Sequence, residues 1–457
     1  MTPEQRATSL FFGQLLLPTG WAGDVRVTID GGRISTIETD AAALPGDERH
    51  GCGLPGMPDL HSHAFQRGMA GLAEQRGPSG DSFWTWRDIM YRFVERMTPD
   101  DVRAIAALAY MEMLERGFTR VGEFHYLHHD RGGAHFADIA EMSGAVAAAA
   151  AETGIGLTLL PVLYSHAGFG AQVPRPDQAR FILNIDDYAR LVEGADRAVA
   201  ALPDAVVGIA PHSLRAVSPE QLRRLGPLAA GRPVHIHIAE QVKEVEDCVA
   251  WSGRRPVEWL LDNVDVDEAW CLVHATHMTD SEATAMARRG AVAGLCPITE
   301  ANLGDGLFPV PAFLDAGGRL GVGSDSNVLI DAAEELRLLE YGQRLVRRER
   351  NVLARGAGRS TGADIYRAAL AGGAVALGAS AGVVLGAPAD IVSLDLRHAS
   401  LEGRAGDAII DGYIFAAGSR AIDCVWRHGK KLVSGGRHRA RAPISSGYRA
   451  ALVRLLA

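Results

Sequence analysis

The sequence predicts an α/β fold: a (β/α)8 TIM-like barrel with a small β-sandwich domain built from both chain ends. Short apolar segments alternate with stretches of helical periodicity through the middle of the chain. Histidines and acidic residues follow the ends of those segments, where barrel enzymes carry their active sites. Both chain ends instead show short alternating strands separated by glycine-containing turns.

Eight apolar segments are expected to form the parallel strands of the barrel. One runs through residues 53–60, and the others are 118–124, 157–163, 206–210, 233–238, 269–273, 291–295 and 319–322. Continuous apolar strands that alternate with helices are typical of a parallel sheet buried on both faces. Eight such units predict a barrel whose active site lies at the carboxyl ends of the strands.

The two chain ends are expected to pair into one β domain. In residues 25–37 two alternating runs flank an Asp-Gly-Gly sequence, which favours a hairpin turn. Residues 389–394 and 421–433 repeat this pattern, with a second hairpin turn at His428-Gly429. The predicted domains are therefore a β-sandwich of residues 1–55 and 386–457 and a catalytic barrel of residues 56–385.

Composition excludes several functional classes. The chain has 457 residues, of which 47% are hydrophobic and 22% charged, as in ordinary folded enzymes. The net charge of -9 and the lack of a basic run argue against nucleic acid and anionic membranes as partners.

No bilayer-length apolar run or signal-peptide pattern occurs, so we expect a cytoplasmic protein. Its five scattered cysteines lack C-x-x-C spacing, which favours a reducing compartment and gives no cysteine zinc site.

The most informative motif lies at the end of the first predicted barrel strand. Residues 53–60 run directly into His61-Ser62-His63. Because side chains alternate along an extended segment, His61 and His63 point to the same side. They provide half of a metal site, although an H-x-H sequence alone also occurs among ordinary histidines, so further ligands must support it.

Three later strand ends supply two further ligands and a catalytic histidine. His237 ends one strand, and Glu240 lies three residues beyond it, where a carboxylate can take a proton from an activated water. His274 ends the next strand, where an imidazole can polarise the substrate. Asp325 ends the last strand and offers an oxygen ligand that can also relay protons. We predict that His61, His63, His237 and Asp325 bind one divalent metal, with Zn²⁺ preferred over Fe²⁺ or Mn²⁺. The predicted catalytic residues are Glu240, His274 and Asp325.

This pattern resembles the amidohydrolase superfamily over nearly the whole chain. The resemblance rests on residues 55–63, PGMPDLHSH, on the later His, His and Asp at strand ends, and on the split β domain. Many members of that superfamily hold two metals bridged by a carboxylated lysine at the end of a middle strand. Residues 157–166 and 206–214 contain no lysine, so the resemblance implies the single-metal deaminase branch.

A finer resemblance is to the formimidoylglutamate deiminase family, which hydrolyses N-formimidoyl-L-glutamate to N-formyl-L-glutamate and ammonia in histidine degradation. It rests on residues 83–87, 123–129, 164–170, 211–215 and 296–306. The resemblance implies that the substrate is bound by Gln66, Arg87, Tyr126, His212 and Arg215. This substrate carries two carboxylates, which suit guanidinium groups because these bind carboxylates bidentately.

Several alternatives stay open from the sequence. Arg87 could be a surface arginine stacked on Trp84 or Trp86, and Arg215 could cap a helix or form a salt bridge. The chemistry could be that of another deaminase of this branch, acting on guanine, a triazine or formimidoylaspartate. A non-catalytic scaffold is a further alternative, but it should have lost ligands. We expect a homodimer acting on a small molecule, and packed or rim positions for His125, His128, His129 and His235.

Overall fold

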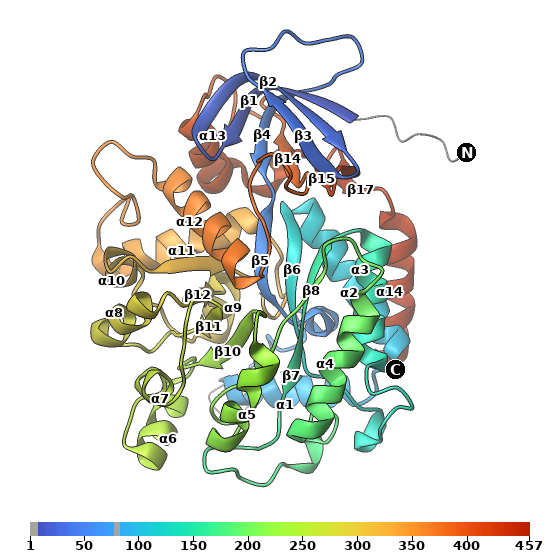
Figure 1. Ribbon diagram of the computed structural model, residues 1–457, viewed down its shortest axis with the longest axis vertical. Helices are drawn as coiled ribbons and strands as arrows, with labels where there is room; N and C mark the ends of the chain where they lie inside the picture. Colours follow the sequence, from blue (N-terminus) through green and yellow to red (C-terminus); the bar gives the residue numbers. More distant parts are fainter. Residues whose placement is uncertain (1–7, 77–82) are drawn as a thin grey trace.

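The computed structural model describes residues 8–76 and 83–457, which form a barrel with a curved β-sheet at one end (Figure 1). The barrel strands lie in two hydrogen-bonded arcs. The first arc contains β5 (Met57–Ser62), β6 (Phe118–His125), β7 (Gly156–Leu163) and β8 (Val206–Val207), with β9 (Ala210–Pro211) paired beside β7. The second contains β10 (Val234–Ile238), β11 (Trp270–His274), β12 (Val292–Leu295) and β13 (Arg319–Val322). All eight predicted segments form strands, and segment 206–210 is divided between β8 and β9.

Isolated parallel bridges join the two arcs. Ser62 pairs with Asp325 at one seam, while Ile209–Val234 and Ser213–His237 form the bridges at the other. Neither seam has a continuous ladder among the described residues. The predicted (β/α)8 architecture is confirmed, with seams that depend on single bridges and side-chain contacts. One of those seams passes directly through the predicted metal centre.

Helices cover the outside of the barrel because the strands are apolar on both faces. They are α1 (Phe83–Val94), α2 (Pro99–Glu115), α3 (Glu141–Thr153), α4 (Ile185–Val199), α5 (Pro219–Ala229), α6 (Val242–Ser252), α7 (Pro256–Asn263), α8 (Asp280–Arg289), α9 (Pro297–Leu303), α10 (Val310–Asp315), α11 (Ala332–Arg347) and α12 (Thr361–Ala376). Shorter helical turns are η1 (Ala64–Met69), η2 (Arg131–Gly133), η3 (Pro176–Gln178), η4 (Tyr413–Ala417) and η5 (Gly418–Ala421). Thr98, Ser218 and Thr279 begin α2, α5 and α8 with capping boxes, which satisfy the first free backbone N–H groups.

Both chain ends contribute to one eight-stranded sheet, as predicted. Its strands are β1 (Thr8–Leu17), β2 (Gly20–Asp30), β3 (Arg33–Glu38), β4 (Glu48–Pro55), β14 (Ile391–Leu394), β15 (Ile422–Arg427), β16 (Lys430–Ser434) and β17 (Arg437–His438). The ends of the chain meet where β4 pairs antiparallel with β14. Both predicted hairpins are present, and each turn includes a glycine with positive φ, 84° at Gly32 and 71° at Gly429.

The sheet folds back on itself, which gives it the packing of a sandwich. The backbone N–H of Ile34, in β3, donates to the carbonyl of Ala387 just before β14. Phe12, Ile391 and Trp426 share one buried core between the N-terminal and C-terminal strands. The two layers therefore belong to a single continuous sheet rather than to two separate ones.

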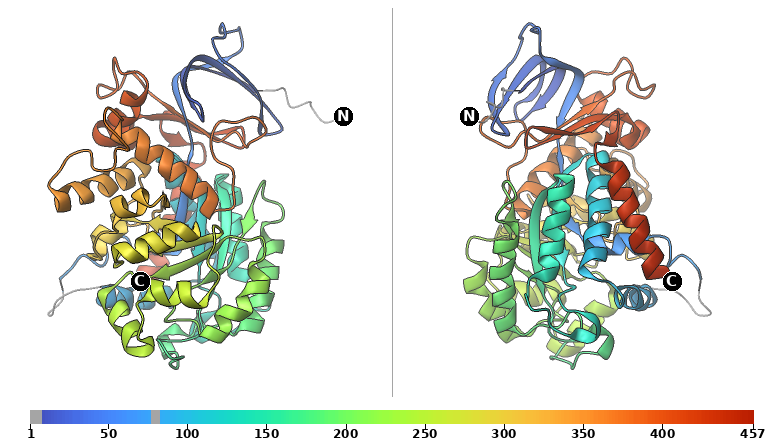
Figure 2. Two further views of the ribbon diagram at one scale, coloured as in Figure 1. Left: turned by 60° about the vertical axis from the view of Figure 1, so that its left-hand side comes forward. Right: turned by 90° about the vertical axis from the view of Figure 1, so that its right-hand side faces the viewer.

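Residues 386–457 are not all β structure, contrary to the simplest form of the prediction. They include α13 (Asp407–Gly412) and α14 (Arg441–Leu456), and α14 packs along α2 of the barrel (Figure 2). Arg454 of α14 forms an ion pair with Asp101 at 2.6 Å, which helps to hold the two helices together. The exact domain boundaries remain a prediction. None of the helices in residues 8–76 and 83–457 has the length and apolarity that a membrane span requires.

Candidate active site

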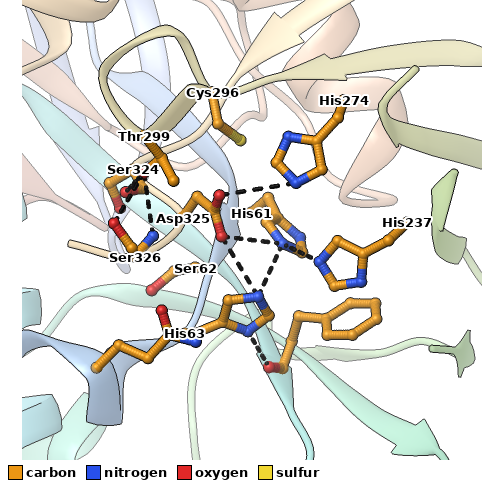
Figure 3. Close-up of polar contacts among 12 residues, drawn as sticks. His61, Ser62, His63, His237, His274, Cys296, Thr299, Ser324, Asp325 and Ser326 are labelled. Atoms are coloured by element: carbon orange, nitrogen blue, oxygen red, sulfur yellow. Dashed lines mark hydrogen bonds and ion pairs between the residues drawn. The ribbon is translucent and has the colours of Figure 1, made fainter. Parts of the chain in front are cut away.

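The four predicted metal ligands converge at the carboxyl end of the barrel (Figure 3). His61 ends β5, His63 follows it, His237 lies near the end of β10, and Asp325 follows β13. All four side chains are buried, and their ligand atoms lie within 4.8 Å of one another. The sequence prediction that these four residues meet at one point agrees with this geometry.

The spacing of the ligand atoms suits a small divalent ion. His61 Nε2 lies 3.2 Å from His63 Nε2 and 3.0 Å from His237 Nε2. Asp325 Oδ1 lies 3.6 Å from His61 Nε2 and 3.3 Å from His63 Nε2. Ligands about 2.1 Å from a tetrahedral ion are roughly 3.4 Å apart. The observed separations therefore match a site of that kind.

Backbone carbonyls orient two of these imidazoles. His63 Nδ1 donates to the carbonyl of Phe124 at 2.8 Å, and His237 Nδ1 donates to the carbonyl of His212 at 3.0 Å. With the proton on Nδ1, Nε2 of each neutral ring carries a lone pair directed into the cluster. Lone pairs facing one another at such distances repel unless a cation lies between them, so the residues fit a bound metal.

Burial keeps these imidazoles neutral. It lowers the pKa of His63 to about 3, and burial together with neighbouring imidazoles holds the pKa of His61 and His237 well below the usual range. Burial raises the pKa of Asp325 to about 7, with the charge of His274 opposing that shift. A cation in the cluster would favour the Asp325 carboxylate. Neutral imidazoles and a carboxylate are the donor set that Zn²⁺ and similar ions take.

His274 and Glu240 lie beside the cluster. His274 Nε2 is 3.7 Å from Asp325 Oδ2 and 3.9 Å from Glu240 Oε1. Burial opposes charge on His274, but the carboxylates of Glu240, Glu300 and Asp325 outweigh it and raise the pKa of His274 well above its usual value. The backbone of His274 and Asp325 is left-handed, with φ of 66° and 47°. Such strain is typical of functional sites, where it directs a side chain into a pocket.

One pocket opens onto these groups. Its lining includes every predicted substrate contact, namely Gln66, Arg87, Tyr126, His212 and Arg215. Gln66 Nε2 donates to the Tyr126 hydroxyl at 2.9 Å, while Gln66 Oε1 has no partner among the described residues. His61 is fully buried and does not line the pocket. The structure thus brings together all of the residues predicted from the sequence.

Two arginines lie in this pocket. Arg87 and Arg215 place their guanidinium carbons 4.6 Å and 5.5 Å from the centre of the Trp84 ring. The sequence alternative that Arg87 stacks on Trp84 is therefore correct, yet Arg87 also lines the pocket. Arg215 is only 7% exposed, and its Nε has no hydrogen-bond partner within residues 8–76 and 83–457; the same holds for Arg87 Nε. Buried positive charge with unused donors suits an anionic ligand.

Sequence reasoning missed two buried carboxylates near this pocket. Glu300 Oε1 lies 3.2 Å from His274 Nδ1, and Glu244 Oε2 accepts a hydrogen bond from the backbone N–H of Glu240 at 3.2 Å. Glu300 follows the end of β12, so the rule that polar residues at strand ends form the site would have selected it. Glu244 lies inside α6, where the sequence gives no comparable signal.

The other histidines lie outside the metal cluster. His125, His128 and His129 each have Nε2 within 2.9 Å of a backbone carbonyl, those of Leu127, Val162 and Ile182. His235 Nε2 lies 2.7 Å from the carbonyl of Ala376. These contacts agree with the packed positions expected for the four histidines.

Comparison of this sequence with known protein families gives two matches. The family described as "Amidohydrolase family" matches residues 53–432. This chain belongs to the amidohydrolase family. A second family description, "Formimidoylglutamate deiminase HutF, N-terminal domain", matches residues 7–51. Strands β1, β2 and β3 of the small sheet lie within this range.

Curated relatives and solved structures extend the comparison. A formimidoylglutamate deiminase of Pseudomonas aeruginosa is 51% identical over 94% of this chain and 96% of its own length. A 5-methylthioadenosine/S-adenosylhomocysteine deaminase of Natronomonas pharaonis is 31% identical over 84% of each chain. The crystal structure of an amidohydrolase from Brucella melitensis is 54% identical, with a TM-score of 0.95 over 98% of this chain and 100% of that one. An adenosine deaminase from Xanthomonas campestris with bound zinc is 23% identical and shares the fold, with a TM-score of 0.82 over 98% of each chain.

Proposed function

We propose that this chain is a formimidoylglutamate deiminase, which hydrolyses N-formimidoyl-L-glutamate to N-formyl-L-glutamate and ammonia. The observation that carries this proposal is one pocket containing a metal-ligand cluster, a carboxylate base and two arginines with unused donors. The 51% identity to the Pseudomonas aeruginosa enzyme over nearly the full length supports the same substrate. Hydrolysis of N-formimidoyl-L-glutamate is a step of histidine degradation, so the proposed enzyme belongs to that pathway.

We propose Zn²⁺ as the metal, held by His61, His63, His237 and Asp325. When bound there, it supplies Lewis acidity that lowers the pKa of a water toward neutrality. Three neutral imidazoles and one carboxylate favour Zn²⁺, and Fe²⁺ or Mn²⁺ would also fit this donor set.

Glu240 is the proposed proton carrier. Its carboxylate takes a proton from the water as the oxygen bonds to the formimidoyl carbon, and Asp325 assists. Glu240 then delivers that proton to the terminal nitrogen. Asp325 takes the second proton of the water from the resulting hydroxyl group and passes it to the same nitrogen, so the formyl carbon–oxygen double bond forms as the carbon–nitrogen bond breaks and ammonia leaves. His274 Nε2, which lies within 4 Å of both carboxylates, donates a hydrogen bond at the reacting centre and orients the nucleophile.

The glutamate part of the substrate is bound by the part of the pocket that Arg87 and Arg215 line. Arg87 and Arg215 hold its two carboxylates, while Gln66, Tyr126 and His212 provide hydrogen bonds. Binding energy gained away from the reacting carbon positions that carbon beside Glu240. A substrate without carboxylates would leave the buried guanidinium of Arg215 and the half-buried guanidinium of Arg87 without an anionic partner, which is costly for a buried charge.

An ammonia-release assay tests the function directly. N-formimidoyl-L-glutamate is compared with N-formimidoyl-L-aspartate, guanine, a triazine and 5′-methylthioadenosine, each with and without a chelator. We expect the highest kcat/KM for N-formimidoyl-L-glutamate and loss of that activity with chelator. Faster turnover of a flat heterocycle would assign the chain to a different deaminase. The proposed cytoplasmic location and homodimeric state are checked separately, by fractionation and by light scattering.

A further inference from the structure

The imidazole ring of His274 lies between carboxylates that face its two nitrogen atoms. Its Nε2 faces Asp325 at 3.7 Å (Figure 3). The same atom lies 3.9 Å from Glu240, and both carboxylates are proposed to relay protons. Its Nδ1 faces away from them and lies 3.2 Å from Glu300 Oε1. The ring therefore bridges the reacting centre and a carboxylate that has no direct access to the metal cluster.

Glu300 is itself fixed in place. It lies in α9, directly after β12, and is only 5% exposed. Its Oε1 accepts a hydrogen bond from the backbone N–H of Cys296 at 2.9 Å, and its own N–H donates to the carbonyl of Cys296 at 2.8 Å. The Cys296 N–H therefore holds the Glu300 carboxylate beside the end of β12, and the backbone bond fixes the start of α9.

A carboxylate hydrogen-bonded to one imidazole nitrogen has two effects on the ring. It fixes the proton on that nitrogen, and it holds the plane of the ring so that the other nitrogen keeps one direction. Here the fixed proton would be on Nδ1, and the directed atom would be Nε2. The backbone of His274 is left-handed, with φ of 66°, a strained conformation that surrounding contacts must hold.

We propose that Glu300 is a positioning residue for the deamination: it accepts a hydrogen bond from His274 Nδ1–H and keeps His274 Nε2 directed at the space between Glu240 and Asp325. This inference rests on the proposed deaminase function. Glu300 touches neither the substrate nor the metal ligands in this scheme, so it acts through His274. Its removal should therefore affect the chemical step more than substrate binding.

The first test is Glu300→Gln, which keeps the shape and can still accept the Cys296 N–H. We expect kcat for N-formimidoyl-L-glutamate to fall about 10- to 100-fold with KM within about twofold of the parent. Metal content and thermal unfolding should match the parent. Glu300→Asp, which restores the charge, should recover part of the kcat. A loss confined to KM, an unchanged kcat, or loss of metal in Glu300→Gln would overturn the proposal.

Glu340→Gln is the matched control. Glu340 is also a buried glutamate that accepts backbone N–H groups, from Val352 and Leu353 at 3.0 Å each. It has no contact with His274, so its replacement should lower thermal stability and leave kcat unchanged. An equal loss of kcat in both variants would assign the Glu300 effect to general destabilisation.

A second measurement does not depend on turnover. In ¹⁵N-histidine NMR of the metal-loaded protein, with the His274 signals assigned by their absence in His274→Asn, Nδ1 should carry the proton. In Glu300→Gln part of the His274 rings should lack the Nδ1 proton, because the amide can also donate to Nδ1. An unprotonated Nδ1 in the parent would refute the proposed hydrogen bond from His274 to Glu300. This result does not depend on which substrate the enzyme uses. Absence of ammonia release by the parent would instead refute the proposed function.

Discussion

Asp59 Oδ2 accepts a hydrogen bond from Ser324 Oγ at 2.6 Å, across the seam between β5 and β13. Asp59 Oδ1 also accepts the backbone N–H of Ser324 at 3.0 Å. These residues lie 265 positions apart in the sequence, yet His61 is two residues beyond Asp59 and Asp325 follows Ser324. One buried carboxylate therefore joins two of the three parts of the chain that carry the metal ligands.

We expect Asp59→Ala to weaken both the fold and the metal site. The backbone N–H of Ser324 would lose its acceptor, while its hydroxyl could still donate to Asn327 Oδ1 at 2.7 Å, so the cost is about 1–3 kcal/mol in the free energy of unfolding. Metal affinity should fall about 10- to 100-fold because the ligands are no longer held together. Thermal denaturation and competition with a chelator measure the two effects.

Asp331→Ala is the control for this prediction. Asp331 caps α11 by accepting the N–H groups of Ala333 and Glu334, away from the metal ligands. Its loss should cost about 0.5–2 kcal/mol in stability with no change in metal affinity. If Asp59→Ala binds metal as tightly as the parent, the seam contact does not support the metal centre.

Metal removal should abolish ammonia release and lower the melting temperature. The three inward-facing imidazoles repel one another without a cation, and a ligand present at about 1,000 times its Kd stabilises the fold by about 4 kcal/mol. Calorimetry before and after dialysis against a chelator measures the shift. Zn²⁺ should restore both properties, and a melting curve that is indifferent to metal would argue against a site in the buried cluster.

Glu240→Gln should retain the metal and lose about 10²- to 10⁴-fold in kcat, since it keeps the shape of the side chain but removes the proposed base. Steady-state kinetics with metal analysis of the same sample check this. Near-normal turnover in the variant would place the base elsewhere.

Arg87→Met and Arg215→Met should each lower kcat/KM for N-formimidoyl-L-glutamate by about 30- to 1000-fold, roughly 2–4 kcal/mol, because a buried charged hydrogen bond is lost. Each variant should lose less with an analogue that lacks the carboxylate its arginine binds. Metal content should be unchanged.

Arg175→Met provides a matched control for the arginines. Arg175 also lies against an aromatic ring, 5.4 Å from the centre of Tyr91, but it is paired with Asp177 and is largely accessible. Its replacement should leave kcat/KM within about twofold. Should both pocket variants match the parent on N-formimidoyl-L-glutamate, the substrate assignment is wrong, although the deaminase chemistry could still stand.

The packing of α12 on the barrel gives a prediction about the fold. A Cβ at Gly372 would lie 1.9 Å from the carbonyl oxygen of Leu320 in β13, so Gly372→Ala must displace the helix. We expect a loss of about 1–3 kcal/mol in unfolding free energy. Gly144→Ala, in α3, meets no atom within 4 Å and should instead stabilise by about 0.5–1 kcal/mol. Urea denaturation compares the two, and equal effects would contradict the tight contact.

The barrel strands and the metal cluster were predictable because both follow from local pattern. Continuous apolar runs mark buried parallel strands, and strand ends collect at one face of a barrel, so His61, His237 and Asp325 could be grouped without a structure. The contact between Glu300 and His274 could not, because it depends on how the ends of two different strands are spaced. The placement of α14 against α2 was missed for a similar reason, since α14 follows the β hairpins directly in the sequence.

The pairing of β4 with β14 has a consequence for synthesis of the chain. β4 is bonded to β1 on one side, but its other partner starts at Ile391, after the whole barrel. At about 5–20 residues per second, that edge of β4 emerges from the ribosome tens of seconds before β14 does. An unpaired edge strand is a template for association with other chains, and β4 carries Gly51, Gly53 and Pro55, residues that weaken such pairing. The sheet that begins first is therefore the last to be completed.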